Sequence, residues 1–254
     1  MKIGIIGTGI IAQAVVQGFC KKGVGHKFNL SPRNADRAAK LAETFEEVFV
    51  CKSNQEVIDK SDCIFICLHK KDFGALSELN YPKELIVINM SAEMRLSDLK
   101  EIAGEVALVA HVIPLPFIAE GYGPLLVYPR ISQVGELFAP VSEVCYADTQ
   151  EDVYTLQIIT GLMSAYNMLL HEVVTFSVER GLAHDDSVRF VASLFGSLGK
   201  RAAKMENCDL IELAHEMTPG GYNEQAMNEL LGNGAISAWR DALDNMRLRL
   251  EGSR

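Results

Sequence analysis

The chain has 254 residues, of which 24 are Lys or Arg and 33 are Asp or Glu, giving a formal net charge of −9. This balance argues against nucleic acid or an anionic membrane as the main partner, because both repel a negative surface. With 48% hydrophobic and 22% charged residues, the composition is that of an ordinary globular protein with room for one large or two ordinary domains. A phosphate-bearing ligand would have to be held locally, by backbone amides and a few cations.

The six cysteines form no CxxC pair, and Cys and His residues show no recurring spacing typical of metal ligands. We therefore expect reduced thiols and no metal. The N-terminus has one Lys before an apolar stretch that glycines interrupt, which does not fit a signal peptide. No later stretch approaches the roughly 20 apolar residues of a membrane helix. A soluble, cytoplasmic chain is the expectation.

The first half alternates between two kinds of periodicity. Short apolar or β-branched runs predict strands, and the segments between them have helical spacing. The expected strands are residues 2–6, 26–31, 48–51, 63–68, 85–89 and 106–112, with helices over 10–22, 34–45 and 55–60. This alternation predicts an α/β Rossmann domain, a doubly wound and mainly parallel sheet, over residues 1–148.

The pattern changes near Asp148, and residues 149–254 are expected to form an all-α domain. One long helix is predicted over 149–181, followed by helices over 187–204, 222–231 and 236–250. The first of these is apolar on more than one face, which so few helices in a monomer could not cover. Burial against a second subunit follows most simply, so we expect a dimerisation domain and a homodimer or larger oligomer.

A glycine-rich turn follows the first predicted strand and opens the first predicted helix. Its residues match the pattern G-x-G-x-x-G/A and are Gly7, Thr8, Gly9, Ile10, Ile11 and Ala12. In this context the first glycine permits a tight turn, the second lets the backbone approach a pyrophosphate, and Ala12 keeps helix and strand close. The helix N-terminus adds free N–H groups. A dinucleotide site is predicted here.

The end of the second predicted strand distinguishes NADP from NAD. An acidic residue there would bind the adenosine ribose of NAD, but this chain has Ser31, Pro32, Arg33 and Asn34, and no carboxylate before Asp36. Ser31, Arg33 and Asn34 can donate hydrogen bonds to a 2′-phosphate, and Arg33 can pair with it in fork geometry. We therefore expect NADP(H).

The helical half and the nucleotide domain together resemble pyrroline-5-carboxylate reductase. The segments that carry the resemblance are ERGLAHDDSVRFVASLFGSLGKRA and EMTPGGYNEQAMNEL. The second holds Thr218-Pro219-Gly220-Gly221, which looks like the Ser-Pro-Gly-Gly turn of that family. The resemblance extends over essentially the whole chain.

This resemblance implies a homodimer with interlocked helical domains and an active site shared between subunits. It implies hydride transfer from NADPH to a cyclic imine, the last step of proline biosynthesis. Thr218, Gly220 and Gly221 would bind the substrate carboxylate, and Tyr222 and Asn223 would lie at the reacting ring. The segment Leu68-His69-Lys70 stands where the family has Val-Lys-Pro, and is expected to contact the cofactor.

Several positions depart from the family pattern. Asn223 replaces the usual Thr or Ser, and Glu93 replaces a glycine near the expected cofactor. These departures leave alternatives open: a reductase of another imine or a keto acid, or a non-catalytic NADPH sensor. His69 and His111 stand at predicted strand ends, where each could donate a proton or contact nicotinamide, or simply be a satisfied loop histidine. A dehydrogenase with a helix-borne catalytic Lys is disfavoured, because no Lys occurs between Thr149 and Gly199.

Overall fold

The computed structural model describes residues 1–252, which divide into two compact units on either side of the Tyr154–Thr155 bond. The N-terminal unit holds an eight-stranded sheet in the order β3-β2-β1-β4-β5-β6-β7-β8. Its first six strands are mutually parallel, β7 is antiparallel to β6, and β8 is parallel to β7. The strands are β1 (Lys2–Ile6), β2 (Lys27–Leu30), β3 (Val48–Val50), β4 (Cys63–Ile66), β5 (Ile86–Asn89), β6 (Leu108–Pro114), β7 (Pro124–Tyr128) and β8 (Glu143–Tyr146). The predicted doubly wound, mainly parallel sheet is confirmed.

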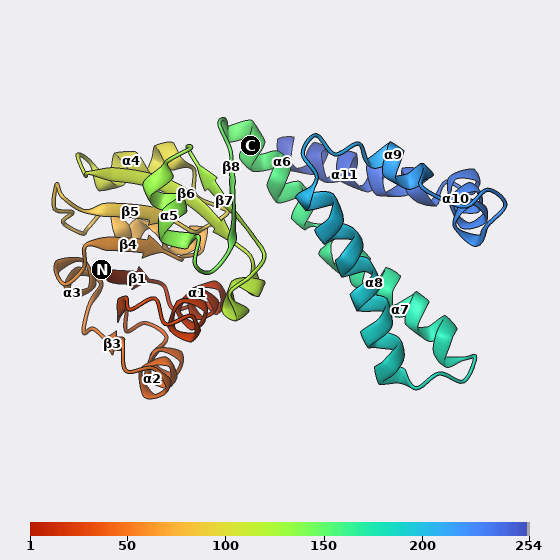
Figure 1. Ribbon diagram of the computed structural model, residues 1–254. Helices are drawn as coiled ribbons and strands as arrows, with labels where there is room; N and C mark the ends of the chain where they lie inside the picture. Colours follow the sequence, from red (N-terminus) through yellow and green to blue (C-terminus); the bar gives the residue numbers. More distant parts are fainter. Residues whose placement is uncertain (253–254) are drawn as a thin grey trace. The chain divides into compact units, whose positions relative to one another are not determined.

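Helices cover both faces of this sheet (Figure 1). They are α1 (Ile10–Lys21), α2 (Ala35–Thr44), α3 (Asn54–Asp59), α4 (Leu96–Ala103) and α5 (Ser132–Phe138), with 3-10 turns η1 (Lys70–Leu76) and η2 (Pro116–Glu120). Strand side chains alternate between two apolar clusters: Ile5 packs with α1, α2 and α5, whereas Ile6 packs with α3, η1 and α4. Burial on both faces explains why the strands are continuous apolar runs.

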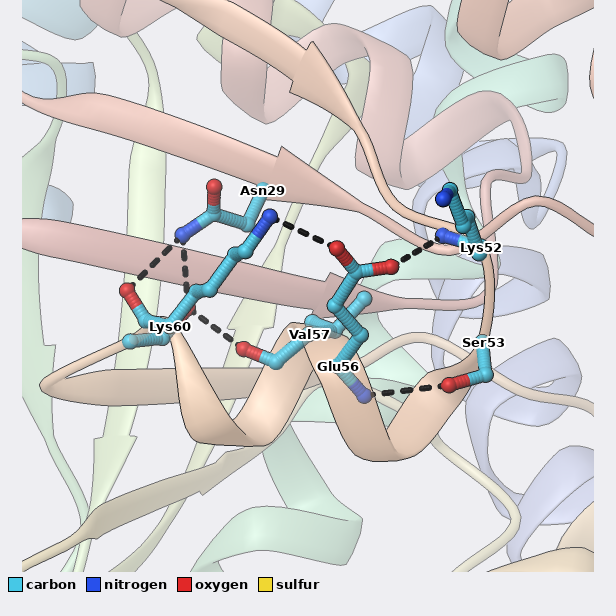
Figure 2. Close-up of polar contacts among 7 residues, drawn as sticks. Asn29, Lys52, Ser53, Glu56, Val57 and Lys60 are labelled. Carbon is cyan, nitrogen blue, oxygen red and sulfur yellow. Dashed lines mark hydrogen bonds and ion pairs between the residues drawn. The ribbon is translucent and has the colours of Figure 1, made fainter.

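Helix α3 is tied to the sheet by the contacts in Figure 2. The Ser53 hydroxyl accepts from the Glu56 N–H at 3.1 Å, and the Glu56 carboxylate accepts from the Lys52 N–H at 2.6 Å. At the other end, the buried Asn29 side chain in β2 donates to the Lys60 carbonyl and the Ser61 hydroxyl. Both ends of a six-residue helix are thus satisfied, as such a short helix requires.

Strands β7 and β8 and helices α4 and α5 were not predicted. Strand β7 begins at Pro124 and is flanked by glycine and a second proline, which are turn residues in sequence. Strand β8 lies at the sheet edge and alternates between exposed and half-buried positions. Strand β7 pairs antiparallel with β6, and β8 pairs parallel with β7; neither pairing has a local sequence pattern.

The second unit is entirely helical over the residues described. Its helices are α6 (Gln150–Thr160), which starts in the first unit, α7 (Met163–Val178), α8 (His184–Lys204), α9 (Leu210–His215), α10 (Tyr222–Gly232) and α11 (Ala235–Glu251). Helices α7 and α8 pack as a hairpin (Figure 1). The predicted domain boundary, between residues 148 and 149, precedes α6 and stays a prediction.

The prediction of a single helix over 149–181 is wrong, because the helix is interrupted at Gly161 and Leu162. There the N–H groups of Gly161 and Leu162 bond three residues back, at 2.9 and 3.1 Å, in place of the α-helical pattern. A Cβ on Gly161 would lie 2.6 Å from the Met246 sulfur of α11. A glycine therefore lets α11 approach the break closely.

Unit two buries few side chains of its own. From residue 155 to 252, only Val174, Ser187 and Val191 are buried. Large apolar side chains of α8 such as Phe190, which is 70% exposed, point to solvent. The stretch Gln150–Val178 is also long and apolar enough, by length and composition alone, to cross a membrane. The expectation that no such stretch exists was wrong, and α8 shows that the exposed apolar surface is not confined to this stretch.

Candidate cofactor and substrate sites

The glycine-rich turn between β1 and α1 has the geometry of a phosphate-binding loop. Gly7 has a φ of +98°, a conformation that only glycine adopts readily, and a Cβ there would lie 2.5 Å from the Cys67 carbonyl oxygen. Gly9 caps α1 without any side-chain hydrogen bond, and a Cβ on Gly9 would meet no atom within 4 Å. The first N–H groups of α1 therefore face open space, as an anion requires.

The other predicted loop residues divide by burial. Thr8 is 3% exposed and its hydroxyl donates to the Ser31 carbonyl at 3.1 Å. Ile10 is exposed and Ile11 half-buried at the start of α1, so both can contribute only backbone to a phosphate. Ala12 is fully buried against the sheet, in agreement with its expected role as a spacer.

Ser31 requires a correction. It was expected to donate to the 2′-phosphate, but it is 1% exposed and its hydroxyl accepts from the Gly7 N–H at 2.9 Å. Its oxygen also lies 3.4 Å from the Thr8 hydroxyl. Ser31 thus supports the turn from behind and does not face a ligand.

A cavity of about 470 Å³ opens over this turn. Three segments line it: the turn itself, the start of α2, and the residues after β4. The lining residues are Gly7, Thr8, Gly9, Arg33, Asn34, Ala35, Asp36, Arg37, Cys67, Leu68, His69, Lys71 and Asp72. The cavity therefore brings together most of the predicted cofactor residues, at the carboxyl ends of β1, β2 and β4, where open α/β sheets bind ligands.

Two arginines in this cavity make side-chain hydrogen bonds. Arg33 binds Asp72 through two contacts of 2.8 Å, and the guanidinium of Arg37 donates to the Thr8 carbonyl at 3.3 Å. The hydrogen bond from Arg33 lowers the pKa of the Asp72 carboxyl, and the same bond raises the pKa of Arg33. The side-chain oxygen of Asn34 caps α2 by accepting from the Arg37 N–H, which leaves the side-chain NH2 group of Asn34 as a donor. Arg33 and Asn34 are thus the exposed donors of the predicted trio.

The residues after β4 differ from the prediction in one respect. Leu68 and His69 line the cavity, but Lys71 takes the place expected for Lys70. The Lys70 N–H instead donates to Glu93 at 2.9 Å, and His69 Nδ1 lies 3.7 Å from the same carboxylate. His69, Lys70, Lys71 and Glu93 line a second, open cavity of about 600 Å³ beside the first. This is a polar surface at the ends of β4 and β5.

His111 is excluded as a surface contact. It lies in β6, is 2% exposed, and neither ring nitrogen has a hydrogen-bond partner among the described residues. Burial lowers its pKa to about 4, with the backbone at Ser91 opposing the shift. The neutral ring is therefore part of the interior.

The predicted substrate turn joins α9 to α10 in the helical unit. Gly220 has a φ of +72° and Gly221 caps α10. Two of its amides are already engaged: the Gly221 N–H donates to the Thr218 carbonyl at 2.9 Å, and the Gly220 N–H donates to the Glu224 carboxylate at 2.6 Å. Tyr222 is 90% exposed and Asn223 follows it in the first turn of α10.

Sequence reasoning left five polar residues out of these sites. Asp36, Arg37, Lys71 and Asp72 line the cavity, and Glu224 bonds to the substrate turn. Asp72 could have been suspected, because it follows β4 closely and strand ends collect ligand residues. The pairing of Asp72 with Arg33 could not be predicted from the sequence, since the two residues are 39 positions apart. Within residues 1–252, no group of three or more His, Cys, Asp or Glu side chains could hold a metal ion.

Comparison with known families identifies the class of the nucleotide-binding part. Residues 2–93 match the model of a family described as NADP oxidoreductase coenzyme F420-dependent. These residues contain the glycine-rich turn, Arg33 and the β4 loop. The match and the cavity together class this part of the chain with NAD(P)-dependent oxidoreductases, in agreement with the expected NADP(H).

Over its full length the fold is that of pyrroline-5-carboxylate reductases. The enzyme from Coxiella burnetii matches with a TM-score of 0.81 at 16% identity, over 98% of this chain and 97% of that one. The Plasmodium falciparum reductase, solved with NADP bound, matches with a TM-score of 0.78 at 17% identity, over 96% and 95%. In sequence, pyrroline-5-carboxylate reductase 2 of Bacillus subtilis is 26% identical over 118 residues, 44% of this chain and 42% of that protein. The sequence match thus spans under half of this curated relative, and over nearly its whole length the chain is similar to these reductases in fold.

Proposed function

We propose that the protein is an NADPH-dependent reductase of a small imine, acting as pyrroline-5-carboxylate reductases do. The cavity over the glycine-rich turn carries this proposal. NADPH, when bound, supplies a hydride to the imine carbon, and a proton is added to the nitrogen, leaving an amine and NADP⁺. A protonated imine is already electrophilic, so the protein needs chiefly to align the reactants and exclude water.

The residues present fit such a cofactor. Free N–H groups at the start of α1 and the bare backbone of Gly9 accommodate a pyrophosphate. Arg33, with its exposed guanidinium, can pair with a 2′-phosphate. Leu68 and His69 line the same cavity from the end of β4. We assign cofactor binding to these groups.

We assign substrate binding to the turn from Thr218 to Asn223, on the resemblance to pyrroline-5-carboxylate reductase. The exposed Tyr222 and Asn223 would lie against the substrate ring. Asn223 can hydrogen-bond a ring nitrogen through its side-chain amide, with a reach different from that of a hydroxyl. The physiological place of such a reaction would be the last step of proline synthesis in the cytoplasm.

The proposal includes a homodimer with a shared active site. Large apolar side chains exposed along α7 and α8, among them Met168, Phe176 and Phe190, support it. Contiguous apolar surface of this kind marks an interface. A second copy of the helical unit is the occupant we propose, because the exposed apolar side chains extend over several helices and not over one membrane-length stretch.

The deciding experiment follows NADPH oxidation with pyrroline-5-carboxylate as substrate, then repeats it with NADH. We expect turnover that prefers NADPH, and none with Gly9→Val, in which a side chain fills the phosphate site. NADPH binding without turnover across a panel of imines and keto acids would contradict the enzyme and favour a sensor. No binding of either cofactor would reject the proposal altogether.

Glu224 favours a second candidate function, the reduction of an imine that carries no carboxylate. Its carboxylate accepts a hydrogen bond from the Gly220 N–H at 2.6 Å, where a substrate carboxylate is expected. A substrate without a carboxylate would not have to displace it. Comparing 1-pyrroline with pyrroline-5-carboxylate tests this, because the two differ by that group alone. Higher kcat/KM for 1-pyrroline, inverted by Glu224→Gln, would identify the second candidate as the activity.

A further inference from the structure

Asp72 stands in the candidate cofactor cavity without a role in the reaction proposed above. It lies in η1, after β4, while its partner Arg33 follows β2. Since β2 and β4 flank β1 on either side, the pair bridges two loops across the glycine-rich turn. Both carboxylate oxygens are engaged, each 2.8 Å from a different guanidinium nitrogen.

This geometry is the one that a guanidinium offers to phosphate. Arg presents a planar fork that binds a carboxylate or a phosphate through two parallel N–H···O contacts, and Asp72 occupies the fork formed by the two terminal nitrogens of Arg33. The Asp72 side chain is 16% exposed while that of Arg33 is 60% exposed. The carboxylate is thus the fixed member of the pair, and the guanidinium is the member accessible to a ligand.

We propose that Asp72 is a specificity-determining residue, whose carboxylate holds Arg33 over the cavity and competes with the 2′-phosphate of the cofactor for the guanidinium. The inference rests on the proposed use of NADPH. A 2′-phosphate that binds the same fork has to displace the Asp72 carboxylate, which then lies close enough to repel the phosphate. NADH has a hydroxyl at that position and leaves the pair intact. Asp72 therefore reduces the preference for NADPH over NADH.

The test measures dissociation constants by calorimetry for four ligands: NADPH, NADH, 2′,5′-ADP and 5′-AMP. In Asp72→Asn we expect binding of the two 2′-phosphate ligands to tighten on the order of tenfold, the scale of one charge-assisted contact, with the other two unchanged. Asp72→Glu keeps the charge and should keep the wild-type ratios. Thermal denaturation of each variant establishes that it is folded.

Two controls separate competition from a general change in charge. Asp36 is a second carboxylate that lines the same cavity, but the partner of Arg33 is Asp72 and not Asp36. Asp36→Asn removes the same charge and should not produce the tenfold selective gain. In an Arg33→Ala background, Asp72→Asn should no longer change the ratio of the dissociation constants of 2′,5′-ADP and 5′-AMP. The guanidinium for which the carboxylate and the 2′-phosphate compete is then absent.

The outcomes distinguish this inference from the function beneath it. If Asp72→Asn lowers the dissociation constant of NADPH no more than that of NADH, the proposed competition is wrong. The reductase proposal would be unaffected by that result. An equal gain in Asp36→Asn would also overturn it. Absence of NADPH binding in the wild-type protein would remove the proposed function, and this inference with it.

Discussion

The hydroxyl of Ser31 accepts a hydrogen bond from the Gly7 N–H at 2.9 Å, linking the end of β2 to the glycine-rich turn. Because Gly7 is buried, Ser31→Ala leaves its N–H without a partner at a cost of about 1–3 kcal/mol. We expect this variant to lose stability and cofactor affinity together, measured by urea denaturation and by NADPH titration.

Ser61→Ala is a matched control for this prediction. The Ser61 hydroxyl also bonds to buried residues, accepting from Asn29 and donating to the Val57 carbonyl, but Ser61 lies just after α3 and does not line the candidate cofactor cavity. It should lower stability alone. If Ser31→Ala weakened NADPH no more than Ser61→Ala does, the support role of Ser31 would be wrong.

The two glycines of the turn should respond oppositely to substitution. Gly9→Val meets no protein atom at its Cβ, so the fold should remain stable while NADPH binding is lost. Gly7→Ala combines a positive φ with a backbone clash at Cys67 and should lower the free energy of unfolding by about 1–3 kcal/mol or more. Thermal denaturation beside cofactor titration distinguishes the two; normal NADPH binding by Gly9→Val would contradict the phosphate site.

Arg33→Ala should weaken NADPH binding by roughly tenfold to a hundredfold, the value of a charge-assisted pair, and leave NADH nearly unchanged. Arg130→Ala is the matched control, since Arg130 also forms a bidentate pair, with Asp148, and does not line the cavity. Equal losses for the two cofactors in Arg33→Ala would show that Arg33 does not contact the 2′-phosphate.

His111 should make stability depend on pH. Its pKa is about 4 in the folded chain, below the ordinary histidine value of about 6.5, so the unfolded chain binds the extra proton first as the pH falls. Stability is therefore full above about pH 6.5 and declines toward pH 4, by about 3 kcal/mol at most from this group. His111→Gln cannot titrate and should flatten that part of the profile. If the free energy of unfolding depends on pH equally in His111→Gln and in the wild-type protein between pH 6.5 and 4, the prediction is wrong.

Phe190→Asp should convert the proposed homodimer to monomers. Phe190 is 70% exposed in α8, and a carboxylate there would be costly to bury in an apolar interface. Light scattering after size exclusion measures the mass directly. Phe49→Asp alters another exposed Phe, in β3 of the N-terminal unit, and should leave the mass unchanged. A monomeric wild-type protein would refute the dimer.

The parallel sheet and phosphate turn could be predicted because their determinants are local. Strands buried on both faces are short apolar runs, and the turn needs glycines at fixed spacing. Asp72, β7 and β8 could not, since each depends on a partner far along the chain. Ser31 was assigned to the ligand because its position was recognised while the direction of its side chain was not. The close approach of Met246 to Gly161 likewise joins residues far apart in the chain.

Cys67 lines the candidate cofactor cavity, and its buried thiol lies 3.8 Å from the Met90 sulfur. Burial raises its pKa to about 12, so at neutral pH it stays protonated and is a poor nucleophile. Thiol-directed labels and mild oxidants will therefore react first at Cys145, which is exposed and outside the cavity. A fluorophore attached there can report cofactor binding without entering the cavity.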